Sequence, residues 1–245
     1  MTSTVVAKIR SLAATKRKYL FEWKLLNHVI VTLLLLVSME AIYLFYRNDH
    51  IFTQEFLLDI YLTLSVVLVA GAVWHLKSYG TDLKSAHLGM MTGMTLGMQT
   101  GMMVGIILGA TDGFFVGALI AMIVAAALGA IGGTCSGVAG VLEGLIAGSM
   151  GGIMGAMAGT MLLDDLFWFM PPFMILNFIV MIGLVYLVFK EATEIKGILH
   201  KSPPRFFRFF LFNLVALTIL TLAVNLAPES NMGDHSGHMS APGAR

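Results

Sequence analysis

The chain has very few charged residues and only one cysteine. Charged residues make up 12% of its 245 residues, whereas 58% are apolar and the mean hydropathy is +0.86. Soluble domains carry about 25% charged residues, so this composition excludes a water-soluble globule, a disordered tail and a nucleic-acid-binding protein. The single cysteine, Cys135, excludes an intrachain disulfide framework and a cysteine-based metal cage.

Lysine and arginine are absent from the 105 residues between Lys84 and Lys190. A bilayer explains this gap, because cations concentrate in the loops that flank transmembrane helices. We therefore expect an all-α, polytopic integral membrane bundle of about seven transmembrane helices. The expected spans are 25–46, 56–76, 87–110, 114–131, 135–162, 173–189 and 206–226. The break at Gly132-Gly133 is the weakest, because apolar residues continue on both sides of it.

The distribution of cations predicts a cytoplasmic amino terminus and an external carboxyl terminus. With seven crossings, only Arg47 and Arg245 of the 15 cationic residues lie outside. The expected organisation is a basic amphipathic cytoplasmic segment at 1–24, the bundle at 25–226 and an external Met/His-rich tail at 227–245. We expect this multi-pass protein in a prokaryotic inner or cell membrane, with the lipid bilayer as its main partner.

Glycine and methionine are concentrated in one segment. Residues 87–161 hold 19 of the 26 glycines and 11 of the 18 methionines. Six glycines recur at every fourth residue from Gly89 to Gly109, and a second series with the same step begins at Gly140. Because small residues let transmembrane helices approach closely, we expect the three spans of this segment to pack tightly as a glycine zipper. The topology predicts that spans 87–110 and 135–162 run parallel.

Methionines follow the same four-residue step. A thioether is soft and neutral, which suits Cu(I), and residues four apart share one face of a helix. We expect these sulfurs to converge on a shared interior line as metal ligands, with Met122 between the two rows; plain packing is the alternative, since methionine fills gaps in cores. The two rows are Met90, Met94, Met98 and Met102, followed by Met150, Met154, Met157 and Met161.

The carboxyl-terminal tail has a metal-capturing composition. Within eight residues it places Met232, His235, His238 and Met239, together with Asp234. Imidazole can hold Cu(II) and thioether can hold Cu(I), so we expect this tail to capture copper ions. A polar tail without function is the alternative.

Spacings in the third expected span resemble those of the eukaryotic high-affinity copper-uptake family. That family is similar in using a Met-x-x-x-Met pair and a Gly-x-x-x-Gly packing motif in its pore helices. The matching pairs here are Met90/Met94, Met94/Met98 and Met98/Met102 with their adjoining glycines. Because that family has three helices and an amino-terminal metal-rich ectodomain, the resemblance is between sites, and it implies copper as the ion.

A few ionisable residues inside or at the ends of spans are further candidates. Glu143 falls within the span 135–162, where a carboxylate is costly; it has either a structural role or a role in proton or ion coupling. His87 and Cys135 open two spans on the same predicted side, so they could form an exit site for a soft ion.

No nucleophile elbow, phosphate loop or zinc-protease motif is present, so we expect no enzyme. The favoured hypothesis is copper handling, by transport, tolerance or delivery. One alternative is a non-catalytic structural subunit held by Gly-x-x-x-Gly packing, as a homo-oligomer or in a larger membrane complex. The other is a cation or proton-coupled secondary transporter or channel that uses Glu143.

Overall fold

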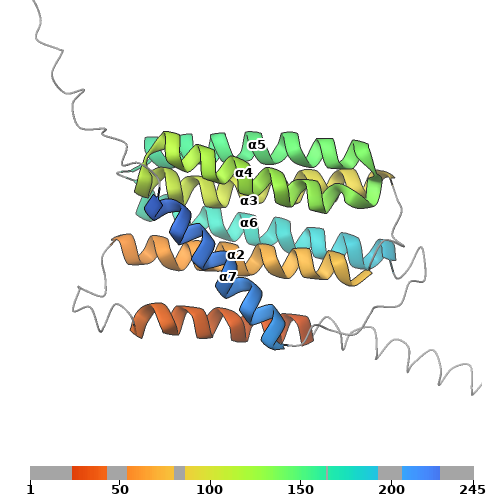
Figure 1. Cartoon of the computed structure of the whole chain (residues 1–245), viewed down its shortest axis with the longest axis horizontal. Coiled ribbons are helices and arrows are strands. Elements are labelled where there is room, and N and C mark those ends of the chain that lie inside the picture. Colours follow the sequence, from red (N-terminus) through yellow and green to blue (C-terminus); the bar gives the residue numbers. More distant parts are fainter. Residues whose placement is uncertain (1–23, 43–53, 80–85, 164, 193–205, 227–245) are drawn as a thin grey trace, which may run out of the picture.

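The computed structural model describes residues 24–42, 54–79, 86–163, 165–192 and 206–226, which form seven α-helices and no strand (Figure 1). The all-α fold that the sequence predicts is confirmed. The helices lie side by side except α7, which crosses the others obliquely. They are Lys24–Ile42, α2 (Gln54–Tyr79), α3 (Ala86–Asp112), α4 (Phe114–Gly133), α5 (Val138–Met161), α6 (Leu166–Lys190) and α7 (Phe206–Leu226), with a short 3₁₀ turn η2 (Thr134–Ser136) between α4 and α5.

Six of the helices are long and apolar enough to cross a membrane. A hydrocarbon core of about 30 Å requires about 20 helical residues, and these segments have 19 to 26. α7 contains a shorter apolar stretch, Phe206–Leu222. The chain is therefore a multi-helix membrane bundle, and the side of the membrane on which each end lies stays a prediction.

Several predicted boundaries were wrong. α6 begins at Leu166 rather than at 173, so Pro171 and Pro172 lie inside the helix. The helix starts early because Leu166 and Met170 in its first turns lie on its buried face, where packing stabilises them. Residues 1–23, 43–46 and 227–245, which include the amphipathic segment and the tail, lie outside the described residues.

The connection between α4 and α5 also differs from the prediction. α4 continues through Gly132 and Gly133, so this pair is not a break. Both glycines are buried against neighbouring backbone, where the close contact favours helix over turn. The fifth helix begins at Val138 rather than at Cys135, because Gly137 has φ +71°, a left-handed conformation that glycine adopts easily.

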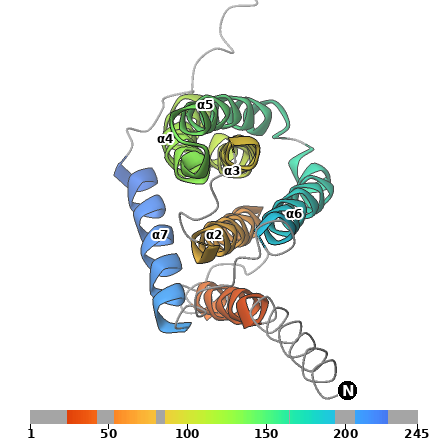
Figure 2. The same cartoon turned by 90° about the vertical axis from the view of Figure 1, so that its right-hand side faces the viewer.

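Helices α3, α4 and α5 form a three-helix unit, called here the hub, which Figure 2 shows end-on. Contacts between α3 and α5 advance in the same direction along both helices, from Gly93 against Gly140 to Gly109 against Ala156. The two helices are therefore parallel, as predicted. α4 runs antiparallel to α5, since its Gly133 meets Gly140 and its Gly129 meets Gly144.

Hub helices touch through their backbones. A methyl group at Gly105 would lie 2.7 Å from the carbonyl oxygen of Gly152 and 2.9 Å from the nitrogen of Ala156. Glycine costs about 1 kcal/mol in helix propensity relative to alanine, and the close backbone packing that it permits offsets that cost. The buried Thr92 hydroxyl adds a hydrogen bond between α3 and α4, because it donates to the carbonyl oxygen of Gly132 at 2.8 Å.

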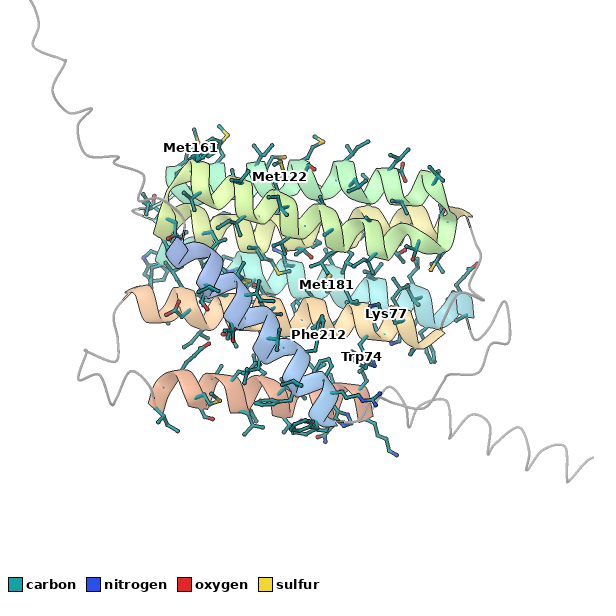
Figure 3. All side chains as sticks on the ribbon, viewed as in Figure 1. Trp74, Lys77, Met122, Met161, Met181 and Phe212 are labelled. Atoms are coloured by element: carbon teal, nitrogen blue, oxygen red, sulfur yellow. The ribbon has the colours of Figure 1, made fainter. Side chains whose placement is uncertain are left out.

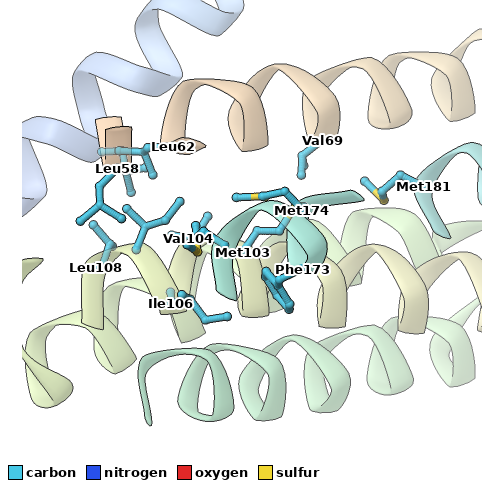
Figure 4. Packing of buried hydrophobic residues seen from close by; sticks show 14 of the residues in the cluster. Leu58, Leu62, Val69, Met103, Val104, Ile106, Leu108, Phe173, Met174 and Met181 are labelled. Atoms are coloured by element: carbon cyan, nitrogen blue, oxygen red, sulfur yellow. The ribbon is translucent and has the colours of Figure 1, made fainter. Parts of the chain in front are cut away.

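On its other side α3 packs against α2 and α6. Here side chains rather than backbones fill the interface, in one buried apolar cluster that Figure 4 shows. Leu58 of α2 lies with Leu166 at one end, and His75 of α2 lies with Val188 at the other. α2 and α6 are therefore parallel to each other.

The hub geometry predicts that adding a single methyl group at a glycine has opposite effects at two helical positions. Gly105→Ala should destabilise the protein by about 1–3 kcal/mol, because the new methyl group would overlap backbone atoms that cannot move aside. Gly183→Ala is the matched control, since no atom lies within 4 Å of its added methyl; it should be neutral or stabilising by up to about 1 kcal/mol. Unfolding of both variants in detergent measures the difference, and equal stabilities would contradict the backbone contact.

Candidate metal-handling site

The four predicted metal-binding methionines of α5 lie on the surface of the chain. Met150, Met154, Met157 and Met161 are all exposed, and Figure 3 shows Met161 at the outer edge of the hub. The glycines of α5 occupy its inward face instead. Because successive residues of a helix are about 100° apart, turning the glycines inward turns these methionines outward. The predicted convergence of both rows on an interior line was therefore wrong.

The methionines of α3 are less exposed than those of α5. Met94 is exposed, and Met90, Met98 and Met102 are half-buried. The backbone of Met98 lies against Gly151, and the backbone of Met102 lies against Gly155. This line of contact between α3 and α5 is called here the α3–α5 seam.

Members of both methionine rows border the same side of the α3–α5 seam. Around α5, Gly148 and Gly152 face α4, whereas Gly151 and Gly155 face α3. At 100° per residue, Met154 follows next on the side away from α4, whereas Met150 faces away from both helices. Met98 of α3, whose backbone contacts Gly151, borders the seam from the other helix.

Glu143 belongs to the same outward face of α5. It is exposed, and it precedes Met150 and Met157 by seven and fourteen residues, which places the three side chains in one column along the helix. In a membrane-spanning helix a carboxylate usually faces the bundle interior or a wet cavity. Here it faces away from the other helices of its own chain.

Two further predicted residues, His87 and Cys135, lie at the same end of the hub, where the backbone of η2 meets α3 at Gly89. His87 is exposed at the start of α3, whereas Cys135 is half-buried in η2 and packs against a small cluster that includes Leu76 and Leu88. The tail residues Met232, His235, His238 and Met239 lie outside the described residues. In the part of the chain that the structure describes, no group of three or more His, Cys, Asp or Glu side chains is placed to hold a metal ion.

Sequence reasoning missed a second set of sulfurs. Met103 of α3 and Met170, Met174 and Met181 of α6 are buried in the α2–α3–α6 interface. The sequence pattern that could have identified these buried methionines is present in α6, where positions 170, 174, 177 and 181 have the spacing of one helix face. This spacing lacks the strict four-residue step of the glycine-rich segment. Met103 lies one residue after Met102, outside the four-residue row of α3.

Comparison with known proteins names no family for this chain. No family model, no curated protein and no solved structure matches it.

The placement of sulfurs predicts unequal reactivity at two positions near the same end of the bundle. In a Cys135→Ser background, Met161→Cys should react with a maleimide at least tenfold faster than Met170→Cys, because Met161 is 71% exposed and Met170 is 1% exposed. The rates can be measured by mass spectrometry on folded protein in detergent, and denatured protein should react equally at both. Equal rates in the folded protein would contradict the outward orientation of the α5 row.

Proposed function

We propose that this protein handles a soft metal ion, copper as Cu(I), through the thioethers that border the α3–α5 seam. The observation that carries the proposal is that half-buried methionines of α3 and the exposed Met154 of α5 border the same α3–α5 seam. Thioethers are neutral and soft, so they suit Cu(I) and not hard cations such as Mg²⁺ or Ca²⁺. The process is transport, tolerance or delivery of the ion.

The proposed path runs along the surface of the hub rather than through it. The glycine contacts between α3, α4 and α5 leave no room for an ion, whereas the seam methionines are accessible from outside the chain. In a bilayer, a second copy of the chain or another membrane subunit would cover such a surface. We propose that the tail captures copper and that the protein resides in a prokaryotic plasma membrane.

Replacing two methionines of each row tests the proposal. The variant Met94→Leu/Met98→Leu/Met154→Leu/Met157→Leu should keep its fold, since each exchange of methionine for leucine costs less than about 1.5 kcal/mol even in a packed core. Copper accumulation or copper tolerance of cells that express it should fall at least fivefold relative to the parent protein. Met39→Leu is the control, because Met39 is an exposed methionine on the first helix, outside the hub.

An unchanged copper phenotype in a normally folded quadruple variant would contradict the copper proposal. That result would favour the alternative of a non-catalytic subunit held by glycine packing, for which the backbone contacts within the hub are the supporting observation.

A second candidate function is a transporter or channel that couples cation or proton movement to Glu143. The supporting observation is an exposed carboxylate on a membrane-spanning helix, in the same column as two of the methionines. Glu143→Gln should abolish the pH dependence of ion flux into proteoliposomes, because the amide cannot release a proton. Glu191→Gln, at the end of α6, is the control; an unchanged pH dependence in Glu143→Gln would exclude this role.

A further inference from the structure

We infer that the α2–α3–α6 interface holds a second, buried site for a soft monovalent cation. Its donor atoms are the sulfurs of Met103 and Met174 and the side-chain carbonyl oxygen of Asn177. These three residues are called here the inner site. All three are at most 6% exposed, and Figure 4 shows Met103 and Met174 within the same buried cluster.

Contacts along α2 place Met103 and Met174 at one level of the bundle. Ser65 Oγ of α2 lies 4.0 Å from the Met174 sulfur. α3 is antiparallel to α2, and near the other end of the interface Ala72 and His75 of α2 share a small cavity with Thr92 and Leu96 of α3. Extending that register by two turns brings Met103 opposite Ser65.

Asn177 lies one turn further along the same face of α6, and one of its polar atoms is unpaired. The side chain is 2% exposed. Its Nδ2 donates to the carbonyl oxygen of Phe173 at 2.8 Å, but Oδ1 is buried with no hydrogen-bond partner among the described residues. A buried acceptor without a partner is costly, so the site favours a bound species that this oxygen can contact.

Neighbouring hydroxyl groups do not donate a hydrogen bond to Asn177 Oδ1. Ser65 donates to the carbonyl oxygen of Tyr61 at 2.7 Å, and Thr100 donates to the carbonyl oxygen of Leu96 at 2.6 Å. Both are buried side chains on the helices that face α6. The Ser65 proton is shared between that carbonyl oxygen and the Met174 sulfur, and the Thr100 proton is used within its own helix, so neither is available to Asn177 Oδ1.

The donor set defines the class of ligand. Two thioethers and an amide oxygen are all neutral, and the surrounding cluster is apolar. Hard divalent cations require several oxygen ligands, and a charge of +2 would be costly to bury here. Cu(I) and its redox-inert analogue Ag(I) fit the donor set. The identity of the ion rests on the proposed function, whereas the site itself rests on the geometry of α2, α3 and α6.

Silver binding to the full-length protein in detergent tests the inner site. Methionines labelled with ¹³C at the methyl group give one resonance each, and single exchanges to leucine assign them. On titration with silver nitrate, the Met103 and Met174 resonances should shift together and saturate at one equivalent. Asn177→Leu should weaken that binding at least tenfold, while the Met39 resonance, as control, should stay unchanged over the same range.

Each outcome separates the inner site from the proposed function. Shifts at the seam methionines without shifts at Met103 and Met174 would overturn the inner site and leave the proposed function standing; a bound water would then satisfy Asn177. Shifts at the inner site alone would support this inference and count against the seam. Unchanged affinity in a folded Asn177→Leu variant would overturn the three-donor site.

Discussion

Backbone packs directly on backbone wherever α3, α4 and α5 meet, and the rest of the structure depends on this constraint. No side chain larger than hydrogen fits at Gly97, Gly101 or Gly105 without moving the backbone of a neighbouring helix. Lipid supplies no hydrophobic drive for helices to associate, so close packing of this kind holds the hub together. It also fixes the direction of every other side chain on the three helices.

The position of the methionines follows from the same constraint. The sequence places a methionine immediately after four of the glycines of α3, and a glycine that faces a neighbouring helix turns the next residue about 100° away. In α5, which has neighbours on its glycine face only, the sulfurs reach the surface. In α3, which is enclosed on more sides, Met103 becomes buried. Methionine therefore occurs in two environments, the accessible surface around the α3–α5 seam and the enclosed α2–α3–α6 interface.

Much of the fold could be predicted from the sequence because its signals are local. The shortage of charge and the lengths of the apolar runs predicted the helices, the four-residue glycine step predicted their close packing, and the order of crossings predicted that α3 and α5 run parallel. Helix ends were predicted less well. Gly132 and Gly133 resemble a break, yet they continue α4 because they lie against backbone, and Pro171 and Pro172 resemble a start, yet α6 begins before them.

Composition and spacing alone determined that this is an α-helical membrane bundle with a tightly packed glycine-rich segment and many soft donor atoms. They could not determine which donors face one another, because that depends on the rotation of each helix against its neighbours. The tertiary structure decided that the α5 methionines face outward and that Met174 and Asn177 face inward. The physical reason is that rotation is set by contacts between residues distant in sequence, such as Gly101 with Gly152 and Ser65 with Met174.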